Sequence, residues 1–317
     1  MWDVLTVGTL MVEFTPTQVG ATLDSGSPLV QYPSGSATIF GRGLARLGRK
    51  VAFVSAVGAD PFGAWMKSTL ESEGIDCSQV RVVEDQFTPL VFVDVDGRGR
   101  RRYLFYRFPN HCEPVAALTD KDLQQVPVEQ ARLFDFTEAS VRSEPGRGPV
   151  LHLARRATQA GIATCFCLNY RPAAWRSPSD AVRIYREALQ YATLAVMNVE
   201  EACLVTGIPD PEKASLHIAD LGPQWVAVTN GERGGWVCAQ GQVTPFAAFP
   251  VEFAYDVGAG DTFHAGLLDA YLEGRTPPEA CRWAAGVVRL KLTQGDPNFF
   301  AFRQQVQDFL AQHGPHS

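Results

Sequence analysis

The sequence lacks an excess of positive charge and has no long apolar run, and each absence excludes a class of function. The 317-residue chain has a formal net charge of -6, whereas binding to nucleic-acid phosphates requires clustered lysine and arginine. Residues 98–102 form one short basic run, which Gly99 interrupts, and a solvated hairpin tip is the simpler interpretation. No stretch approaches the ~18 consecutive apolar residues of a membrane span. We therefore expect no nucleic-acid partner and no membrane partner.

Cysteine is scarce and irregularly spaced. Seven cysteines are present, several of them inside apolar segments, so reduced buried thiols are expected rather than disulfides. Cys165 and Cys167 form an isolated C-x-C, and a metal site there would need a second Cys or His pair at ligand spacing. Such a pair is missing near them in the sequence. Because the chain also opens on a strand-like run without a basic leader, we expect a cytoplasmic protein.

The sequence does have a regular alternation of apolar and amphipathic segments. Hydrophobic residues make up 46% of the chain, enough for one large core or two modest ones. Strands are predicted at residues 4–7, 51–54, 132–136, 162–167, 194–197 and 225–228. Stretches of helical period lie between them. This alternation is typical of an α/β fold with a central, mostly parallel sheet flanked by helices, which binds ligands near the carboxyl ends of its strands.

Two segments, residues 12–33 and 88–108, break this alternation. Both are rich in β-forming residues and have no helix between their strands. We expect them to form a small antiparallel β lid over the ligand cleft, outside the main sheet. Since the sequence has no internal repeat and no low-complexity linker, a single domain over residues 1–317 with these lid segments inserted is predicted.

The most informative local pattern is residues 255–266. Apolar residues after Asp261 mark one face of a helix, so Gly258 and Gly260 lie at its start. A helix start presents unpaired N–H groups and a positive dipole end, and glycines let phosphate oxygens approach closely. An aspartate there could accept a proton from an attacking hydroxyl. The alternative is that the glycines form only a tight turn and that Asp261 caps the helix. The loop is not a Walker A motif, because no Lys-Ser/Thr pair follows.

Further short motifs follow one another along the chain. They are the first strand ending at Gly8, then residues 45–48, 57–63, 169–172, 198–201, 228–234 and 258–261. In this order they resemble the ribokinase-like, PfkB family of carbohydrate kinases over nearly the whole chain. The resemblance implies an ATP-dependent sugar kinase that transfers the γ-phosphoryl group of MgATP to a hydroxymethyl group of a sugar or keto-deoxy sugar acid. In the family, residues matching Gly258, Ala259 and Gly260 form an anion hole, and the residue matching Asp261 is the catalytic base.

The resemblance also assigns residues to the cofactors, ATP and Mg²⁺. Asn198 and Glu201 match an N-x-x-E motif that organises Mg²⁺ and the ATP phosphates through water, which suits an ion that keeps much of its hydration. Thr229, Gly231 and Gly234 match the loop that lines the nucleotide. From the residues alone, Asn198 and Glu201 are equally a helix cap with a first-turn acid.

The implied substrate contacts are Glu13, Gly35, Arg107, Asn169, Arg171 and Asp261. Residues 88–92, 105–110 and 169–175 are most similar to 2-keto-3-deoxygluconate kinases and 5-dehydro-2-deoxygluconokinases, which phosphorylate keto acids. Two guanidinium groups, of Arg107 and Arg171, would suit a carboxylate, because a planar fork binds it through two hydrogen bonds. The alternative for Arg107 is an exposed residue of the lid.

The sequence departs from the family pattern at several positions. Ile39 stands where an asparagine is usual, Glu13 and Cys167 each replace an aspartate, and Tyr255 with Asp256 replaces an Asp-Thr pair. The last change puts activation by a monovalent cation in doubt. These departures leave open a kinase of a neutral ketose or nucleoside, and a catalytically weak binding or regulatory member of the family. An apolar face expected on the lid predicts a homodimer through it.

Overall fold

The alternating segments fold into a large sheet that has helices on both faces. The computed structural model describes residues 1–18, 21–95, 101–106, 113–251, 258–294, 296 and 298–314. Within them the main sheet has nine strands, in the order β13-β12-β11-β10-β9-β8-β1-β4-β5. They are β1 (Trp2–Val7), β4 (Val51–Gly58), β5 (Asp76–Val83), β8 (Ala131–Thr137), β9 (Ala163–Cys167), β10 (Leu194–Asn198), β11 (Trp225–Thr229), β12 (Gly235–Ala239) and β13 (Gln242–Phe246). From β5 to β11 all pairings are parallel, and β11, β12 and β13 pair antiparallel. The α/β fold and all six predicted strands are confirmed.

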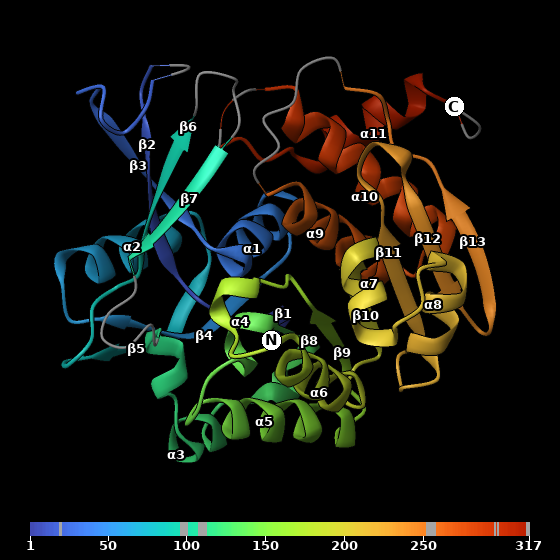
Figure 1. Cartoon of the computed structure of the whole chain (residues 1–317), viewed down its shortest axis with the longest axis horizontal. Coiled ribbons are helices and arrows are strands. Elements are labelled where there is room, and N and C mark those ends of the chain that lie inside the picture. The colour runs from blue at the N-terminus through green and yellow to red at the C-terminus, as the bar shows by residue number, and fades with distance from the viewer. Residues whose placement is uncertain are drawn as a thin grey trace.

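Side chains alternate across the sheet, so each strand contributes to a core on either face. In β1, Val4 packs into one core, while Leu5 and Val7 pack into the other. The core containing Val4 is covered by α1 (Ser36–Arg46), α2 (Pro61–Ser72), α9 (Ala259–Leu272), α10 (Pro277–Leu292) and α11 (Arg303–Gln312). The other is covered by α5 (Arg147–Gln159), α6 (Pro178–Leu189), α7 (Val199–Thr206) and α8 (Pro211–Ala219). Two shorter helices are α3 (Asp120–Gln124) and α4 (Glu138–Val141). Figure 1 shows α1 and α9 on one side of the strands and α5 and α6 on the other.

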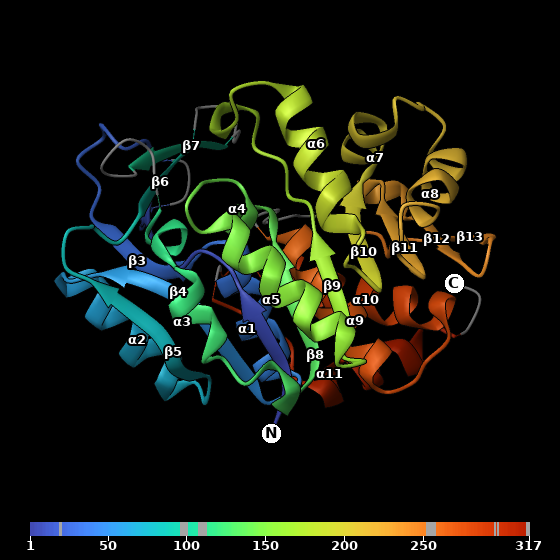
Figure 2. The same cartoon turned by 90° about the horizontal axis from the view of Figure 1, so that it is seen from below.

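The two segments predicted as a lid form a separate four-stranded sheet in the order β3-β2-β6-β7. Its strands are β2 (Met11–Pro16), β3 (Leu29–Ser34), β6 (Leu90–Val95) and β7 (Arg101–Tyr106). Both views show β6 and β7 beside the main sheet rather than within it (Figure 1, Figure 2). Two of the three pairings are antiparallel, and β2 pairs with β6 in parallel, since the chain runs through α1, β4, α2 and β5 between them. The small separate sheet is therefore confirmed.

The predictions of no membrane partner and of a single domain concern the overall organisation of the chain. Within the part of the chain that the structure describes, no helix has both the length and the apolar character to cross a membrane. The single domain over residues 1–317 stays a prediction.

Candidate active site

A cavity of about 590 Å³ lies between the lid sheet and the carboxyl ends of the parallel strands. From the main sheet it is lined by the ends of four strands, at Thr137, Cys167, Asn198 and Thr229. From the lid sheet it is lined by Met11, Glu13, Val91, Tyr103 and Phe105. The lid segments thus cover the edge of the main sheet where the α/β pattern predicts ligand binding.

The start of α9 forms one wall of this cavity. Gly258 precedes the helix with φ +75°, a conformation that glycine adopts without strain. The first helical bond runs from the N–H of Thr262 to the carbonyl of Gly258 at 2.8 Å, so the N–H groups of residues 259–261 have no acceptor within the helix. Together with the helix dipole, these N–H groups make a site suited to an anion.

Asp261 lies in the first turn of α9 and faces the same cavity. One carboxylate oxygen, Oδ1, accepts hydrogen bonds from the hydroxyl of Ser36 and, at 3.4 Å, from the amide of Asn169. The residue that precedes the helix is Gly258, and its start has no side-chain cap. Among the described residues, no backbone N–H bonds to the Asp261 carboxylate. The alternative in which Asp261 caps the helix is therefore wrong.

Asn198 and Glu201 also line the cavity, at the end of β10 and the start of α7. Each accepts a hydrogen bond from the backbone N–H of the other, at 2.8 and 2.9 Å, so the helix-cap interpretation is confirmed. Glu201 also accepts from the N–H of Tyr170 at 2.6 Å. Burial raises the pKa of Glu201 to about 7, although the N–H groups of Asn198 and Tyr170 and the guanidinium of Arg171 oppose this change.

The three residues predicted to line the nucleotide are not all brought together. Thr229 lines the cavity, whereas Gly231 and Gly234 lie beyond it in the turn after β11. A Cβ atom at Gly234 would come within 2.0 Å of the carbonyl oxygen of Phe246. The close approach of these two backbone segments therefore accounts for glycine at position 234 without any ligand.

Of the predicted substrate residues, most line the cavity, and one lies outside the described residues. Glu13 is 3% exposed, and its carboxylate accepts from the hydroxyls of Ser34 at 2.7 Å and Thr15 at 3.1 Å. Gly35, Asn169 and Arg171 also line the cavity. Arg107 and the pair Tyr255-Asp256 lie outside the described residues. Of the two arginines predicted to hold a carboxylate, the structure therefore places only Arg171.

A buried ionic group near the cavity was missed by the sequence analysis. Arg142 bonds to both carboxylate oxygens of Glu138 at 2.9 and 3.0 Å and lies 3.4 Å from Glu113. Thr9 donates to Glu113, and the indole N–H of Trp175 donates to Glu138 at 2.6 Å. Although burial opposes its ionisation, the two glutamates raise the pKa of Arg142 above its ordinary value. The i,i+4 spacing of Glu138 and Arg142 after a predicted strand was the available signal.

Carboxylates outnumber guanidinium groups in the cavity lining. Five acidic residues line it, against the two arginines. The acids are Glu13, Glu113, Glu138, Glu201 and Asp261, and the arginines are Arg142 and Arg171. The described lining has no lysine.

Comparison with known proteins gives the family. The model of the family described as "pfkB family carbohydrate kinase" matches residues 1–300. A fructokinase from Klebsiella pneumoniae is 31% identical over 246 residues, which cover 77% of this chain and 78% of the relative. A 5-dehydro-2-deoxygluconokinase from Mesomycoplasma hyopneumoniae is 25% identical over 284 residues, 88% of this chain and 83% of the relative. An E. coli protein solved in complex with ATP and Mg²⁺ superposes with a TM-score of 0.87 at 21% identity, and the alignment covers 99% of this chain and all of that one. The chain belongs to the pfkB family of carbohydrate kinases and is an ATP-dependent kinase of that class.

Proposed function

We propose that this kinase transfers the γ-phosphoryl group of ATP to a hydroxymethyl oxygen of a sugar, with Asp261 as the base. The observation that carries the proposal is the position of the Asp261 carboxylate, which faces the cavity beside the N–H groups at the start of α9 that have no acceptor within the helix. Ser36 and Asn169 orient it from outside the helix. A carboxylate held in this way can accept the hydroxyl proton, while the N–H groups of residues 259–261 stabilise negative charge on the transferred group.

Asn198, Glu201 and Thr229 are proposed to hold the nucleotide end of the cavity. When bound, Mg²⁺ would neutralise charge on the phosphates. Glu201 suits a hydrated magnesium ion, because its carboxylate is already positioned by two backbone N–H groups and no second acid is needed. The relative from E. coli that was solved with ATP and Mg²⁺ has this fold and supports the assignment.

For the acceptor, the lining favours a sugar without a carboxylate. Five acidic residues and two arginines would repel an anionic substrate more than a neutral one, and a fructokinase is among the relatives. The keto-deoxy sugar acid predicted from the sequence is the second candidate, because Arg171 lines the cavity and a 5-dehydro-2-deoxygluconokinase is also a relative.

Replacement of Asp261 with Asn tests the role of the base. We expect turnover to fall by ~10² to 10⁴, the contribution of a positioned base, while ATP binding and the melting temperature stay close to wild type. Asp210→Asn is the matched control, because Asp210 also lies at a helix start but is exposed and remote from the cavity. Wild-type turnover in the Asp261 variant would overturn the proposal.

A substrate panel measured by ADP release separates the acceptors. One neutral ketose, one nucleoside and one keto-deoxy sugar acid are compared, and no release with any of them would favour the weak binding or regulatory member. If the acid is the substrate, Arg171→Ala and Arg107→Ala should each lower kcat/KM for it by about one to two decades, because a charge-assisted hydrogen bond contributes ~1.5–3 kcal/mol. An equal loss on neutral and acidic substrates would mean that these arginines do not recognise a carboxylate.

Three further sequence predictions stay predictions: the homodimer, the cytoplasmic location and the doubt about a monovalent cation. The homodimer is supported by the exposed aromatic side chain of Tyr106 on β7, an edge strand of the lid sheet whose Tyr103 and Phe105 line the cavity. Light scattering during gel filtration measures the mass. Titration of turnover with potassium chloride measures any activation by a monovalent cation.

A further inference from the structure

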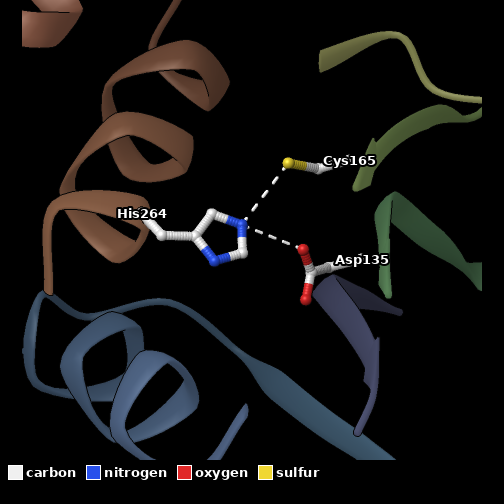
Figure 3. Close-up of side chains that lie close together, drawn as sticks. All are labelled: Asp135, Cys165 and His264. Carbon is white, nitrogen blue, oxygen red and sulfur yellow. Dashed lines mark hydrogen bonds and ion pairs between the residues drawn. The ribbon is translucent and has the colours of Figure 1, made fainter. Parts of the chain in front are cut away.

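The helix that carries Asp261 is anchored to the main sheet by a buried polar group. His264, one turn after Asp261 on α9, points its Nε2 atom at Asp135 of β8 and Cys165 of β9 (Figure 3). The distances from Nε2 are 3.0 Å to Oδ1 of Asp135 and 3.4 Å to the Cys165 sulfur. Thr6 of β1 donates to the other Asp135 oxygen at 2.7 Å. We call these four residues the sheet clamp.

The sheet clamp lies in a region that is otherwise apolar. Its histidine, aspartate and cysteine have no solvent exposure, and Phe40 of α1 stacks on the imidazole with ring centres 4.1 Å apart. Beyond His264, α9 packs largely through small and aliphatic side chains, and Gly266 allows α10 to approach closely. Apolar burial has no direction, so polar contacts add to side-chain packing in fixing the height and rotation of the helix. The Nε2 atom of His264 forms a hydrogen bond with the Cys165 sulfur and lies 3.0 Å from Asp135, and these two contacts favour one placement.

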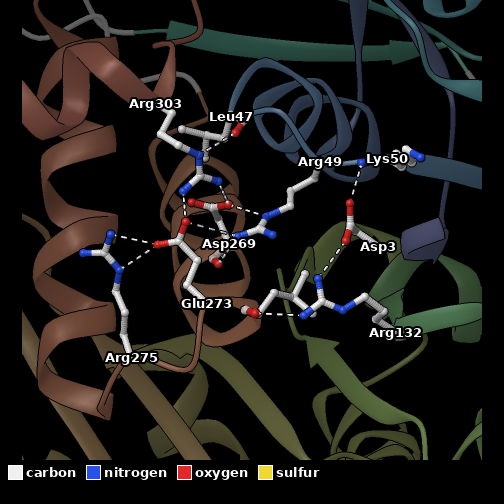
Figure 4. A network of polar contacts seen from close by, with 10 residues as sticks. Asp3, Leu47, Arg49, Lys50, Arg132, Asp269, Glu273, Arg275 and Arg303 are labelled. Atoms are coloured by element: carbon white, nitrogen blue, oxygen red, sulfur yellow. Dashed lines mark hydrogen bonds and ion pairs between the residues drawn. The ribbon is translucent and has the colours of Figure 1, made fainter.

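A second polar group fixes the far end of α9, and it provides a comparison. Asp269 is fully buried and accepts hydrogen bonds from Arg49, at 2.6 Å, and from Arg303 of α11. Glu273 completes this group, which we call the arginine clamp (Figure 4). It lies two turns further from the anion-binding N–H groups than Asp261 does, so disturbing it should affect the fold more than the chemistry.

The three donors of the sheet clamp are also atoms that zinc binds. A structural zinc site has four ligands, and a catalytic one has three ligands and a water. Within the described residues, these three form the only such group, and no fourth His, Cys or acidic ligand joins it. With three ligand side chains where a structural zinc site has four, a polar clamp accounts for the geometry better than a metal centre does.

We propose that His264 and Asp135 are positioning residues for phosphoryl transfer. Their contact helps to fix the height and rotation of α9 on the sheet, and thereby the distance of Asp261 and the anion-binding N–H groups from the reacting atoms. This inference rests on the proposed role of Asp261. A displacement of about 1 Å can lower a rate by ~10²-fold, so the clamp should affect kcat more than KM.

The test replaces the pair in a way that separates positioning from stability. Asp135→Leu combined with His264→Phe substitutes apolar side chains for a buried polar pair, an exchange that is often neutral or stabilising. We expect its melting temperature to be close to wild type, its KM for MgATP to change less than threefold, and its kcat to fall ~10- to 100-fold. Asp135→Asn, which keeps the size of the side chain and a polar oxygen beside Nε2, should keep kcat within about threefold.

Asp269→Asn in the arginine clamp is the matched control on the same helix. It should melt at a lower temperature and keep kcat within about threefold. If the double variant does not fold, His264→Asn, which is too short to reach Asp135, should show the same loss of kcat. A folded double variant with wild-type kcat, or an equal loss of kcat in Asp269→Asn, would overturn the proposal. So would stoichiometric zinc in the purified protein. Failure of the proposed function itself would appear differently, as normal turnover in Asp261→Asn.

Discussion

Gly260 offers a direct test of whether the start of α9 binds phosphate. It is the second residue of the helix, its φ is not positive, and a Cβ atom built on it meets no atom of the described residues within 4 Å. In the described part of the chain, the fold therefore makes no demand for glycine at this position. Alanine is preferred over glycine in a helix by up to ~1 kcal/mol, and for 317 residues the unfolding entropy converts 1 kcal/mol into about 1.5 °C. Gly260→Ala should therefore melt at the wild-type temperature or slightly above it.

Activity should respond in the opposite direction. If phosphate oxygens bind the N–H groups of residues 259–261, a methyl group at position 260 stands in their path. Loss of one charge-assisted hydrogen bond costs ~1.5–3 kcal/mol, so kcat/KM for MgATP should fall by about one to two decades. Gly148→Ala is the matched control, since Gly148 is also the second residue of a helix with open space around its Cβ, but it lies away from the cavity.

Gly258 should behave differently, because its requirement for glycine comes from the fold. Its φ is +75°, and a Cβ atom there would lie 3.0 and 3.1 Å from two carbon atoms of Ile39. A left-handed conformation costs alanine ~1–2 kcal/mol, so Gly258→Ala should melt about 1.5–3 °C lower. Thermal melts and ADP-release kinetics on the three variants give the comparison. If Gly260→Ala keeps the wild-type kcat/KM for MgATP, the loop is a turn and not a phosphate site.

Three other expectations follow from buried charges. Burial raises the pKa of Glu201 to about 7. Because the ionised carboxylate is the form that suits Mg²⁺, kcat/KM for MgATP should rise about tenfold per pH unit below 7. Glu201→Gln should lose this pH dependence, whereas Glu200→Gln, at an exposed position, should keep it. Burial lowers the pKa of Lys291 to about 8 from an unfolded value of 10.5. The free energy of unfolding should therefore rise by up to ~3 kcal/mol as pH rises from 8 to 10.5, because the unfolded state binds the proton more tightly. In urea unfolding, Lys291→Met should show a flatter pH dependence. Arg142→Met removes the guanidinium that its two buried glutamates share, and it should cost ~3–5 kcal/mol in urea unfolding. Arg81→Met, whose ion pair is exposed, should cost less than ~1 kcal/mol.

The strands that the sequence predicts are those buried on both faces. Residues 225–228 and 194–197 form short, continuous apolar runs because helices cover both sides of β10 and β11. β5 was missed because it is an edge strand in which polar, exposed residues interrupt the apolar ones. The hairpin of β12 and β13 was missed because β13 has no buried residue and β12 has only three.

In the site, the contrast is between residues that are contiguous in the sequence and residues that only the fold brings together. Residues 258–261 are contiguous, so their chemistry can be interpreted from a local pattern. The partners that orient Asp261 come from α1 and from the segment after β9, and the Cys165 sulfur meets a histidine 99 residues away. A search for a second ligand at local spacing could not find His264, because only the packing of α9 on the sheet brings it there. Spacing along the chain carries no information about such contacts.

The two clamps on α9 bear on whether this chain turns over substrate or only binds it. A protein that binds a phosphate needs only the helix start, since N–H groups and a dipole attract an anion over a range of positions. Catalysis also requires a fixed distance between a base and the reacting oxygen. Apolar packing alone would satisfy the first requirement, whereas buried polar groups such as His264 with Asp135 are useful chiefly for the second. Both clamps are formed in this chain, so the buried polar contacts that would hold α9 in place for turnover are present alongside the departures at Glu13, Ile39 and Cys167.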